Sequence, residues 1–395
     1  MISNRVLEMK ESQTLAMARR SRAMKEAGHD VISLSLGEPD FNTPEFIKEG
    51  VKAAVDADFS HYTAVPGLLE AREAIALKFK RDNQLVFTPD QIMMSTGAKQ
   101  SLAQIMLAIL NKGDEVILPA PYWVSYLQMV ELAEGKAVEI STEASNHYKI
   151  TPDQLKSSIT DKTKAFLFSS PCNPSGSLYS KEELEALANV LKDYPNILII
   201  SDEIYELINF SGKHESIAQF ESVKNQTVIV NGLSKGYAMT GYRLGYIAGP
   251  KHIVDACIKV QGQITSATCA ITQKAAQVAL EADPSAVKYM RDSFLERRNY
   301  MHGELSKLED LILPMPEGAF YLFPDVSNYF GKSYKGKTIE TSSDFAEMLL
   351  ESEFVATVDG SAFGSPKCLR LSYAAGMETL KEAVVRIQRF VSEIK

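Results

Sequence analysis

The chain has 395 residues, of which 45% are hydrophobic, and its formal net charge is −8. This length exceeds what one hydrophobic core usually serves, so we expect two domains or one large domain with an appendage. The negative charge argues against a nucleic-acid backbone or an anionic membrane surface as the main partner, although cations can still gather in a cleft.

The first 28 residues predict an amphipathic helix rather than a signal peptide, because no compact apolar core precedes a cleavage site. No window approaches the roughly 18 to 20 apolar residues of a membrane span. The four cysteines are far apart and the six histidines lack metal-ligand spacing, so neither a disulfide scaffold nor a metal site is expected. We therefore expect a cytoplasmic protein that binds no membrane.

Between about residue 90 and 250, short apolar runs alternate with amphipathic segments. Apolar runs of this kind are typical of strands buried on both faces, and their order predicts a mainly parallel sheet covered by helices on both faces. The last of these helices should begin with a capping box formed by Ser180 and Glu183. The predicted strands are "QIMMST", "DEVILPAP", "KAFLFSSP", "NILIISDEIY" and "QTVIVNG", and the predicted helices are residues 98–110, 122–133 and 181–193.

The pattern changes near Pro284. A long helix over residues 286–309 is followed by the strand-like runs "GAFYLFPDV" and "CLRLSYA", which predict a second, smaller α+β domain, while residues 329–343 predict an exposed loop. We expect residues 1–45 to form an N-terminal arm and part of the small domain. Residues 46–284 should form the large domain, and residues 285–395 the small C-terminal domain.

Polar residues stand where several strands of the first domain should end. Because the carboxyl ends of parallel strands meet at one edge of a sheet, these residues should converge there. Taken singly, each has an ordinary explanation: Asp202 could cap a helix, and Lys235 could be a solvated surface lysine. The residues are Gly97, Ala98 and Lys99 after the first strand, Asn173 after the third, Asp202 and Tyr205 after the fourth, and Ser234, Lys235 and Arg243 after the fifth.

Taken together, these residues fit the chemistry of pyridoxal phosphate. That cofactor needs a lysine amine for covalent attachment and an acid beside its ring nitrogen, while its phosphate favours an arginine and a helix N-terminus. Lys235, Asp202, Arg243 and the helix start at Gly97–Ala98 supply one of each. The glycine fingerprint G-x-G-x-x-G is absent, which argues against a nicotinamide-dependent dehydrogenase.

Along nearly its whole length the chain resembles the class I aminotransferases of pyridoxal-phosphate fold type I, and within them the bacterial aspartate aminotransferases. Nine motifs occur in the family's order, which makes the resemblance specific. They are "SLGEPDFNTP", "HYTAVPG", "STGAKQSL", "PAPYWVSY", "SSPCNPSG", "SDEIYE", "NGLSKGYAMTGYRLGY", "EGAFYLFPD" and "LRLSYA". The sequence departs from the family at Tyr242, where relatives often carry tryptophan, and at Ala71, where leucine is usual; neither position touches the expected chemistry.

The resemblance implies the fold, an α/β large domain with a smaller α+β domain, and a role for each matching residue. Lys235 would bind the cofactor covalently and carry the proton, Asp202 would pair with the ring nitrogen, and Tyr205 would bond the phenolic oxygen. The other implied cofactor contacts are Asn173, Trp123, the phosphate-binding residues Gly97, Ala98, Ser234 and Arg243, and Tyr62, which would reach the neighbouring subunit's phosphate. The implied substrate contacts are Arg370, Asn173, Gly37, Trp123 and Lys99.

The implied activity is transfer of the amino group of L-aspartate, or of a related amino acid, to 2-oxoglutarate in a homodimer with shared active sites. Lys99 would meet the distal carboxylate of an acidic substrate, but a phosphate-side or surface lysine is its ordinary alternative. A prephenate or aromatic aminotransferase stays open, since prephenate is also a dicarboxylate. An alternative of another class is a non-catalytic, ligand-binding regulator on the same fold.

Overall fold

The computed structural model describes residues 1–9 and 13–395. The predicted N-terminal helix is present as two segments, α1 (Asn4–Glu8) and α2 (Gln13–Glu26), and the intervening residues 10–12 lie outside the described residues. Met17 and Met24 of α2 pack against a small buried cluster beside the C-terminal part of the chain. Helix α1 instead contacts a helix of the first half of the chain, α6 (Ser125–Leu132).

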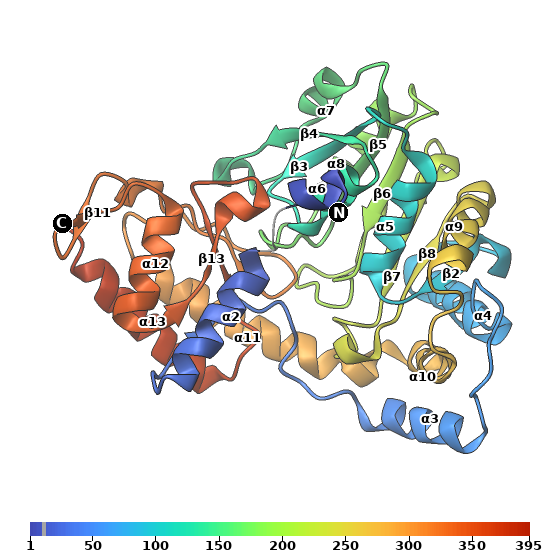
Figure 1. Cartoon of the computed structure of the whole chain (residues 1–395), viewed down its shortest axis with the longest axis horizontal. Coiled ribbons are helices and arrows are strands. Elements are labelled where there is room, and N and C mark those ends of the chain that lie inside the picture. The colour runs from blue at the N-terminus through green and yellow to red at the C-terminus, as the bar shows by residue number, and fades with distance from the viewer. Residues whose placement is uncertain (10–12) are drawn as a thin grey trace.

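A seven-stranded sheet occupies the right-hand half of the molecule in Figure 1. Its strand order is β2-β8-β7-β6-β5-β3-β4, and every neighbouring pair is parallel except the two that involve β8. The mainly parallel sheet is therefore confirmed. In this order, the strands are β2 (Ile92–Ser95), β8 (Gly245–Ala248), β7 (Thr227–Gly232), β6 (Leu198–Asp202), β5 (Thr163–Ser169), β3 (Glu115–Ala120) and β4 (Lys136–Ser141).

Helices cover both faces of this sheet, because successive strand residues point to opposite sides and both sets are apolar. Met93 of β2 packs into the cluster on one face, whereas Met94 packs into the cluster on the other. The first face is covered by α5 (Ala98–Ile109), α6 and α9 (Lys251–Ile264). The second face is covered by α3 (Glu45–Asp56), α4 (Leu69–Lys78), α7 (Pro152–Ser158), α8 (Lys181–Leu191) and α10 (Ala270–Glu281).

Two of the predicted helix starts are confirmed. Helix α5 begins at Ala98, and α8 begins with the predicted capping box, in which the Ser180 hydroxyl accepts a hydrogen bond from the Glu183 amide at 3.2 Å. The helix expected from residue 122 begins later, at Ser125, and the backbone amide of Tyr122 donates instead to the Phe363 carbonyl at 3.1 Å.

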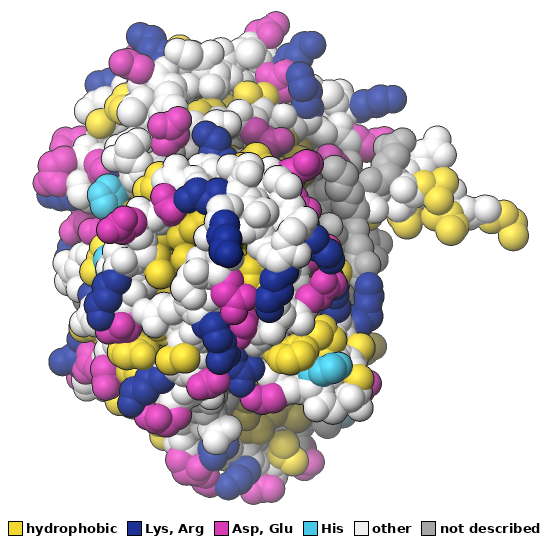
Figure 2. Space-filling view, turned by 90° about the vertical axis from the view of Figure 1, so that its left-hand side faces the viewer, with side chains coloured by type: hydrophobic (Ala, Val, Ile, Leu, Met, Phe, Trp, Pro, Cys, Tyr) yellow, Lys and Arg dark blue, Asp and Glu magenta, His cyan; other side chains and the backbone are white. Residues whose placement is uncertain are grey.

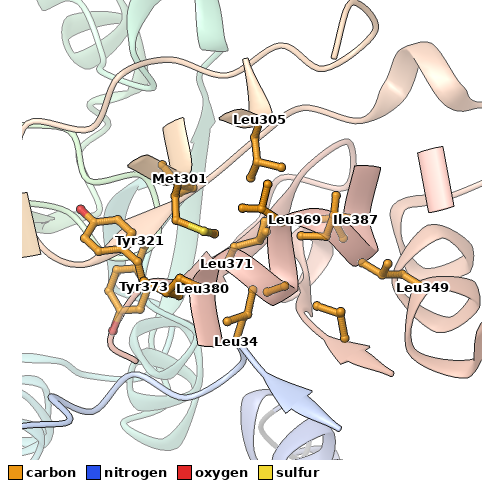
Figure 3. Close-up of a cluster of buried hydrophobic side chains, with 14 of the residues drawn as sticks. Leu34, Met301, Leu305, Tyr321, Leu349, Leu369, Leu371, Tyr373, Leu380 and Ile387 are labelled. Atoms are coloured by element: carbon orange, nitrogen blue, oxygen red, sulfur yellow. The ribbon is translucent and has the colours of Figure 1, made fainter. Parts of the chain in front are cut away.

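The C-terminal part of the chain folds around a second core, which includes residues from the N-terminus (Figure 3). Strand β1 (Ile32–Ser33) pairs in parallel with β12 (Val355–Ala356), and Leu34 is buried among Met301, Leu369 and Leu380. The remaining elements are α11 (Lys288–Leu305), α12 (Ser342–Glu353), α13 (Met377–Ser392) and a small antiparallel sheet of β13 (Val358–Asp359), β14 (Leu369–Ser372) and β9 (Tyr321–Leu322). Segments about 320 residues apart in the chain thus share one core.

The exposed loop predicted for residues 329–343 is wrong in part. The segment contains a short hairpin of β10 (Ser333–Tyr334) and β11 (Lys337–Thr338), and Tyr329, Tyr334 and Ile339 are buried. The Tyr334 ring lies 4.5 Å from the ring of Phe390 on α13. Polar residues separate these three buried side chains in the sequence, so the segment showed no apolar pattern that would indicate burial.

Positive and negative side chains are interspersed over the end of the molecule that carries α12 and α13 (Figure 2). Within the described ranges, no helix is both long enough and apolar enough to cross a membrane.

A buried ion pair joins α4 to the turn that follows β6. Lys78, 1% exposed, pairs with Glu206 and donates a hydrogen bond to the Asn83 amide oxygen at 2.8 Å. Burial alone would raise the pKa of Glu206, but Lys78 and His214 outweigh it and lower that pKa. Removing one member of a buried pair leaves the other charge uncompensated.

Replacing Lys78 by methionine should therefore lower the free energy of unfolding by about 3–5 kcal/mol, as measured by urea denaturation. The matched control is Lys48→Met, since the ion pair of Lys48 with Glu45 lies on the surface and its loss should not change stability measurably. Equal effects of the two substitutions would contradict the structural role of Lys78.

Candidate active site

A cavity of about 370 Å³ opens at the carboxyl edge of the large sheet, facing the C-terminal core. It is lined by residues from the N-terminal segment, from the ends of β5, β6 and β7, and from β14, and we call it the central cavity. The predicted residues that line it are Gly37, Ala98, Lys99, Trp123, Asn173, Asp202, Tyr205, Ser234, Lys235, Arg243 and Arg370. The predicted convergence of the strand ends is thus present in the structure.

Lys235 stands three residues beyond the end of β7 and points across the central cavity. Its Nζ donates a hydrogen bond to the Gly37 carbonyl at 2.5 Å. Burial lowers the pKa of Lys235 to about 8; Arg370 and Arg243 add to the effect, while Glu38 and Asp202 oppose it. An amine with such a pKa can exist uncharged near neutral pH, which nucleophilic or base chemistry requires.

Asp202 ends β6 and is only 4% exposed. One carboxylate oxygen accepts a 2.6 Å hydrogen bond from the Tyr126 hydroxyl, and the other accepts from the Ile204 amide at 3.2 Å. Burial raises the pKa of Asp202 to about 6, against these hydrogen bonds and the charge of Lys235, which lower it. A cationic ligand group beside Asp202 would stabilise its ionised form.

Arg370, on β14, is 1% exposed. Its guanidinium donates to the Ser35 carbonyl at 2.6 Å and to the Asn173 side-chain oxygen at 3.0 Å, while its Nε has no partner. The rings of Tyr321 and Phe363 lie 4.6 and 5.0 Å from its central carbon. No carboxylate of the described residues forms an ion pair with it, so this buried cation is suited to an anionic ligand.

Tyr205 is buried beside Arg370, and its hydroxyl lies 2.8 Å from that of Tyr321. Tyr321 and Tyr126 are site residues that the sequence reasoning did not single out. Both stand in motifs that it did identify, and Tyr126 follows Trp123 by three residues within the helix that the sequence predicted from residue 122. That spacing was the available signal, because residues three apart share one face of a helix.

The opposite end of the central cavity is the N-terminus of α5. Gly97 has a φ of +82°, and a Cβ there would lie 2.5 Å from a terminal nitrogen of Arg243. A Cβ on Gly245 would lie 2.2 Å from the Ala98 amide nitrogen. These two glycines therefore allow β8 and Arg243 to approach the helix start, where free amides and a guanidinium favour an anion such as phosphate.

Lys99 and Trp123 lie together on the wall of the central cavity. The Lys99 ammonium is 4.8 Å from the centre of the Trp123 ring, and burial followed by the charge of Arg243 lowers its pKa. Like Lys235, Arg243 and Arg370, Lys99 forms no ion pair with a carboxylate of the described part of the chain. Four cations thus surround one cavity, whose own acids are Asp202 and Glu38.

Gly97 and Tyr62 are the two predicted site residues that do not line the central cavity. Gly97 stands directly before the lining residue Ala98, whereas Tyr62 is 97% exposed, in the segment before α4.

The model of the family "Aminotransferase class I and II" matches residues 29–387. The chain is 44% identical to an aspartate aminotransferase of Bacillus subtilis, over 99% of both chains. It is also 44% identical to an aspartate/prephenate aminotransferase of Nitrosomonas europaea, over 99% of this chain and all of that one. A solved aspartate aminotransferase from Rhizobium meliloti, 40% identical, superposes over the full length of both chains with a TM-score of 0.97.

These similarities confirm the predicted resemblance and the fold type I architecture. The full-length superposition covers both the large sheet and the C-terminal core, and so includes every element that lines the central cavity. The chain is therefore an aminotransferase, and it belongs to the class I and II aminotransferase family.

Proposed function

We propose that the protein is a pyridoxal-phosphate-dependent aminotransferase that moves the amino group of L-aspartate to 2-oxoglutarate. The observation that carries this proposal is the meeting of Lys235, Asp202 and Arg370 in the central cavity. The cavity thus offers an amine of lowered pKa, a buried acid and a buried guanidinium without a carboxylate partner.

The residues of the cavity fit pyridoxal phosphate. Gly97, Ala98, Ser234 and Arg243 would hold its phosphate at the start of α5, and Asp202 would face its ring nitrogen. Trp123 would lie against the ring face, with Asn173 and Tyr205 toward its phenolic oxygen. When bound through Lys235, the cofactor supplies an electron sink for the negative charge that develops at the substrate α-carbon.

The chain's own residues then perform the proton transfer. Arg370 would hold the α-carboxylate, helped by Asn173 and the backbone at Gly37, so that the α-hydrogen faces Lys235. Once the substrate's amine has displaced it, Lys235 would be a free amine, and its lowered pKa suits a group that takes this proton as a base and returns it as an acid. Asp202, ionised against a cationic ring nitrogen, would keep that nitrogen protonated throughout.

Lys99 supports a dicarboxylic substrate, because it adds a cation to the wall of the cavity. The similarity to proteins named aspartate aminotransferase supports aspartate as the amino donor. The similarity to a protein named aspartate/prephenate aminotransferase supports prephenate as a second candidate substrate. A comparison of amino donors against 2-oxoglutarate, oxaloacetate and prephenate would separate the two.

A homodimer with shared sites is part of the proposal. Beside Arg243, a second hollow of about 640 Å³ is lined by Thr96, Tyr242 and Thr268 among others. A partner's exposed segment around Tyr62 could enter there and reach the phosphate end of the site. A cytoplasmic location remains a prediction from the sequence.

We also propose the domain division predicted from the sequence, at residues 45 and 284. The pairing of β1 with β12 supports assigning the first segment partly to the small domain.

Lys235→Ala should abolish the absorption band of the bound cofactor and lower the rate of half-reaction with aspartate by at least about 10²–10⁴-fold, the usual contribution of a general acid–base. Absorbance spectra and single-turnover kinetics would measure both. Lys251→Ala, at an exposed lysine on α9, is the control and should behave as the original protein. Unchanged turnover in Lys235→Ala would refute the assignment.

Lys99→Met should lower kcat/KM for aspartate by about 10- to 150-fold, the effect of losing a hydrogen bond to a charged group. Alanine lacks the distal carboxylate, so its kcat/KM should change little. Arg370→Lys provides the contrast, since it should weaken both substrates. If Lys99→Met weakened aspartate and alanine equally, Lys99 would belong to the phosphate end of the site.

Mixed dimers test the shared site. Tyr62→Phe should raise the Kd of the cofactor by about 10- to 150-fold. In a heterodimer of Tyr62→Phe and Lys235→Ala subunits, one site would receive both intact residues and regain the original affinity. If Tyr62 instead served its own subunit, no site in the heterodimer would regain that affinity.

A further inference from the structure

The turn from Asp202 to Glu206 has two faces. Asp202 and Tyr205 line the central cavity, whereas Glu203 and Glu206 belong to a buried group of ionisable side chains that does not line it. The two pairs alternate within one turn of chain directly after β6. The contacts that hold Glu203 and Glu206 therefore also fix the direction of Asp202 and Tyr205, which face the cavity.

Glu203 is fully buried and is held by three side chains. One of its oxygens accepts hydrogen bonds from Ser201 at 2.9 Å and from Ser216 at 2.6 Å. The other lies 3.0 Å from Nε2 of His214, whose Nδ1 is buried without a partner. The backbone amide of Glu203 donates to the Val230 carbonyl on β7 at 2.8 Å.

The neighbouring glutamate has a separate cation. Lys78 pairs with Glu206, and Asn83 donates to the same carboxylate at 3.3 Å. The ligand atoms of Glu203, Glu206 and His214 lie within 4.8 Å of one another, but Lys78 already supplies a positive charge there. The group is thus an ion cluster of the fold, with Glu203 as its member next to Asp202.

We propose that Glu203 is a positioning residue for Asp202: held from behind by Ser201, His214 and Ser216, it aims Asp202 into the central cavity and adds negative charge to that side of the site. This proposal rests on the proposed function, because the charge acts on the ring nitrogen of the cofactor. Glu203 contributes to the raised pKa of Asp202.

Other ionisable groups also face this region. Asp202 is approached by Tyr126 from α6, Cys172 from the loop after β5, Lys235 from beyond β7, and Tyr205 from its own turn. Tyr246 of β8 lies near Glu203 and Glu206. Among these groups, Glu203 is the carboxylate adjacent to Asp202 in the chain.

The test titrates the absorbance of the bound cofactor with pH and measures the Kd of pyridoxal phosphate. Negative charge stabilises a protonated cofactor, so Glu203→Gln should move the titration midpoint to lower pH by about one unit, a typical effect of a nearby charge. The Kd should rise as well. Ser216→Ala is the matched control: it removes a hydrogen bond to Glu203 but no charge, so its midpoint should stay unchanged.

Glu203→Asp provides a second, milder variant in case Glu203→Gln does not fold. It keeps the charge but shortens the side chain, so the midpoint should stay while the Kd rises. An unchanged midpoint in Glu203→Gln, an equal shift in Ser216→Ala, or an unchanged Kd in Glu203→Asp would overturn the proposal. If the unaltered protein bound no pyridoxal phosphate, the proposed function itself would fail.

Discussion

The cost of burying positive charge governs the architecture around the central cavity. Arg370 lies in the interior with two oxygen acceptors, two aromatic rings and one unpartnered nitrogen. A guanidinium in that setting is unfavourable unless an anion joins it. The other charged residues of the site leave this positive charge without a carboxylate partner. Lys99 and Arg243 add further positive charge, and the Asp202 carboxylate accepts a hydrogen bond from Tyr126 instead of pairing with Arg370.

The N-terminal segment ties this site together. Between β1 and α3 it offers the Ser35 carbonyl to Arg370 and the Gly37 carbonyl to Lys235. The segment is anchored just beyond by Asp40, which Arg297 of α11 grips with two hydrogen bonds of 2.6 and 3.0 Å. One stretch of chain therefore contacts α11, Arg370 and Lys235, and so connects the C-terminal core to two of the four cations of the cavity.

Much of this arrangement could be predicted from the sequence, because strands buried on both faces and polar residues at their ends leave local signals. The sequence signal of strand β8 is weaker, since this strand is four residues long and runs antiparallel in a glycine-rich stretch. The hydrogen-bond partners of Asp202 and Tyr205 were not predicted either. Tyr126 is 76 residues from Asp202, and Tyr321 is 116 residues from Tyr205. Contacts over such separations depend on how helices and sheets pack, which local pattern does not encode.

The close approach at Gly245 has a consequence for redesign of the enzyme. A Cβ on residue 245 would meet the Ala98 backbone amide, and residue 97 holds a φ of +82° beside Arg243, so neither glycine at the start of α5 accommodates a side chain. Lys99 and Trp123 line the cavity with their side chains instead of through a close backbone approach. Mutant libraries that seek enzymes for new amino donors should therefore vary the residues around Lys99 and leave Gly97 and Gly245 unchanged.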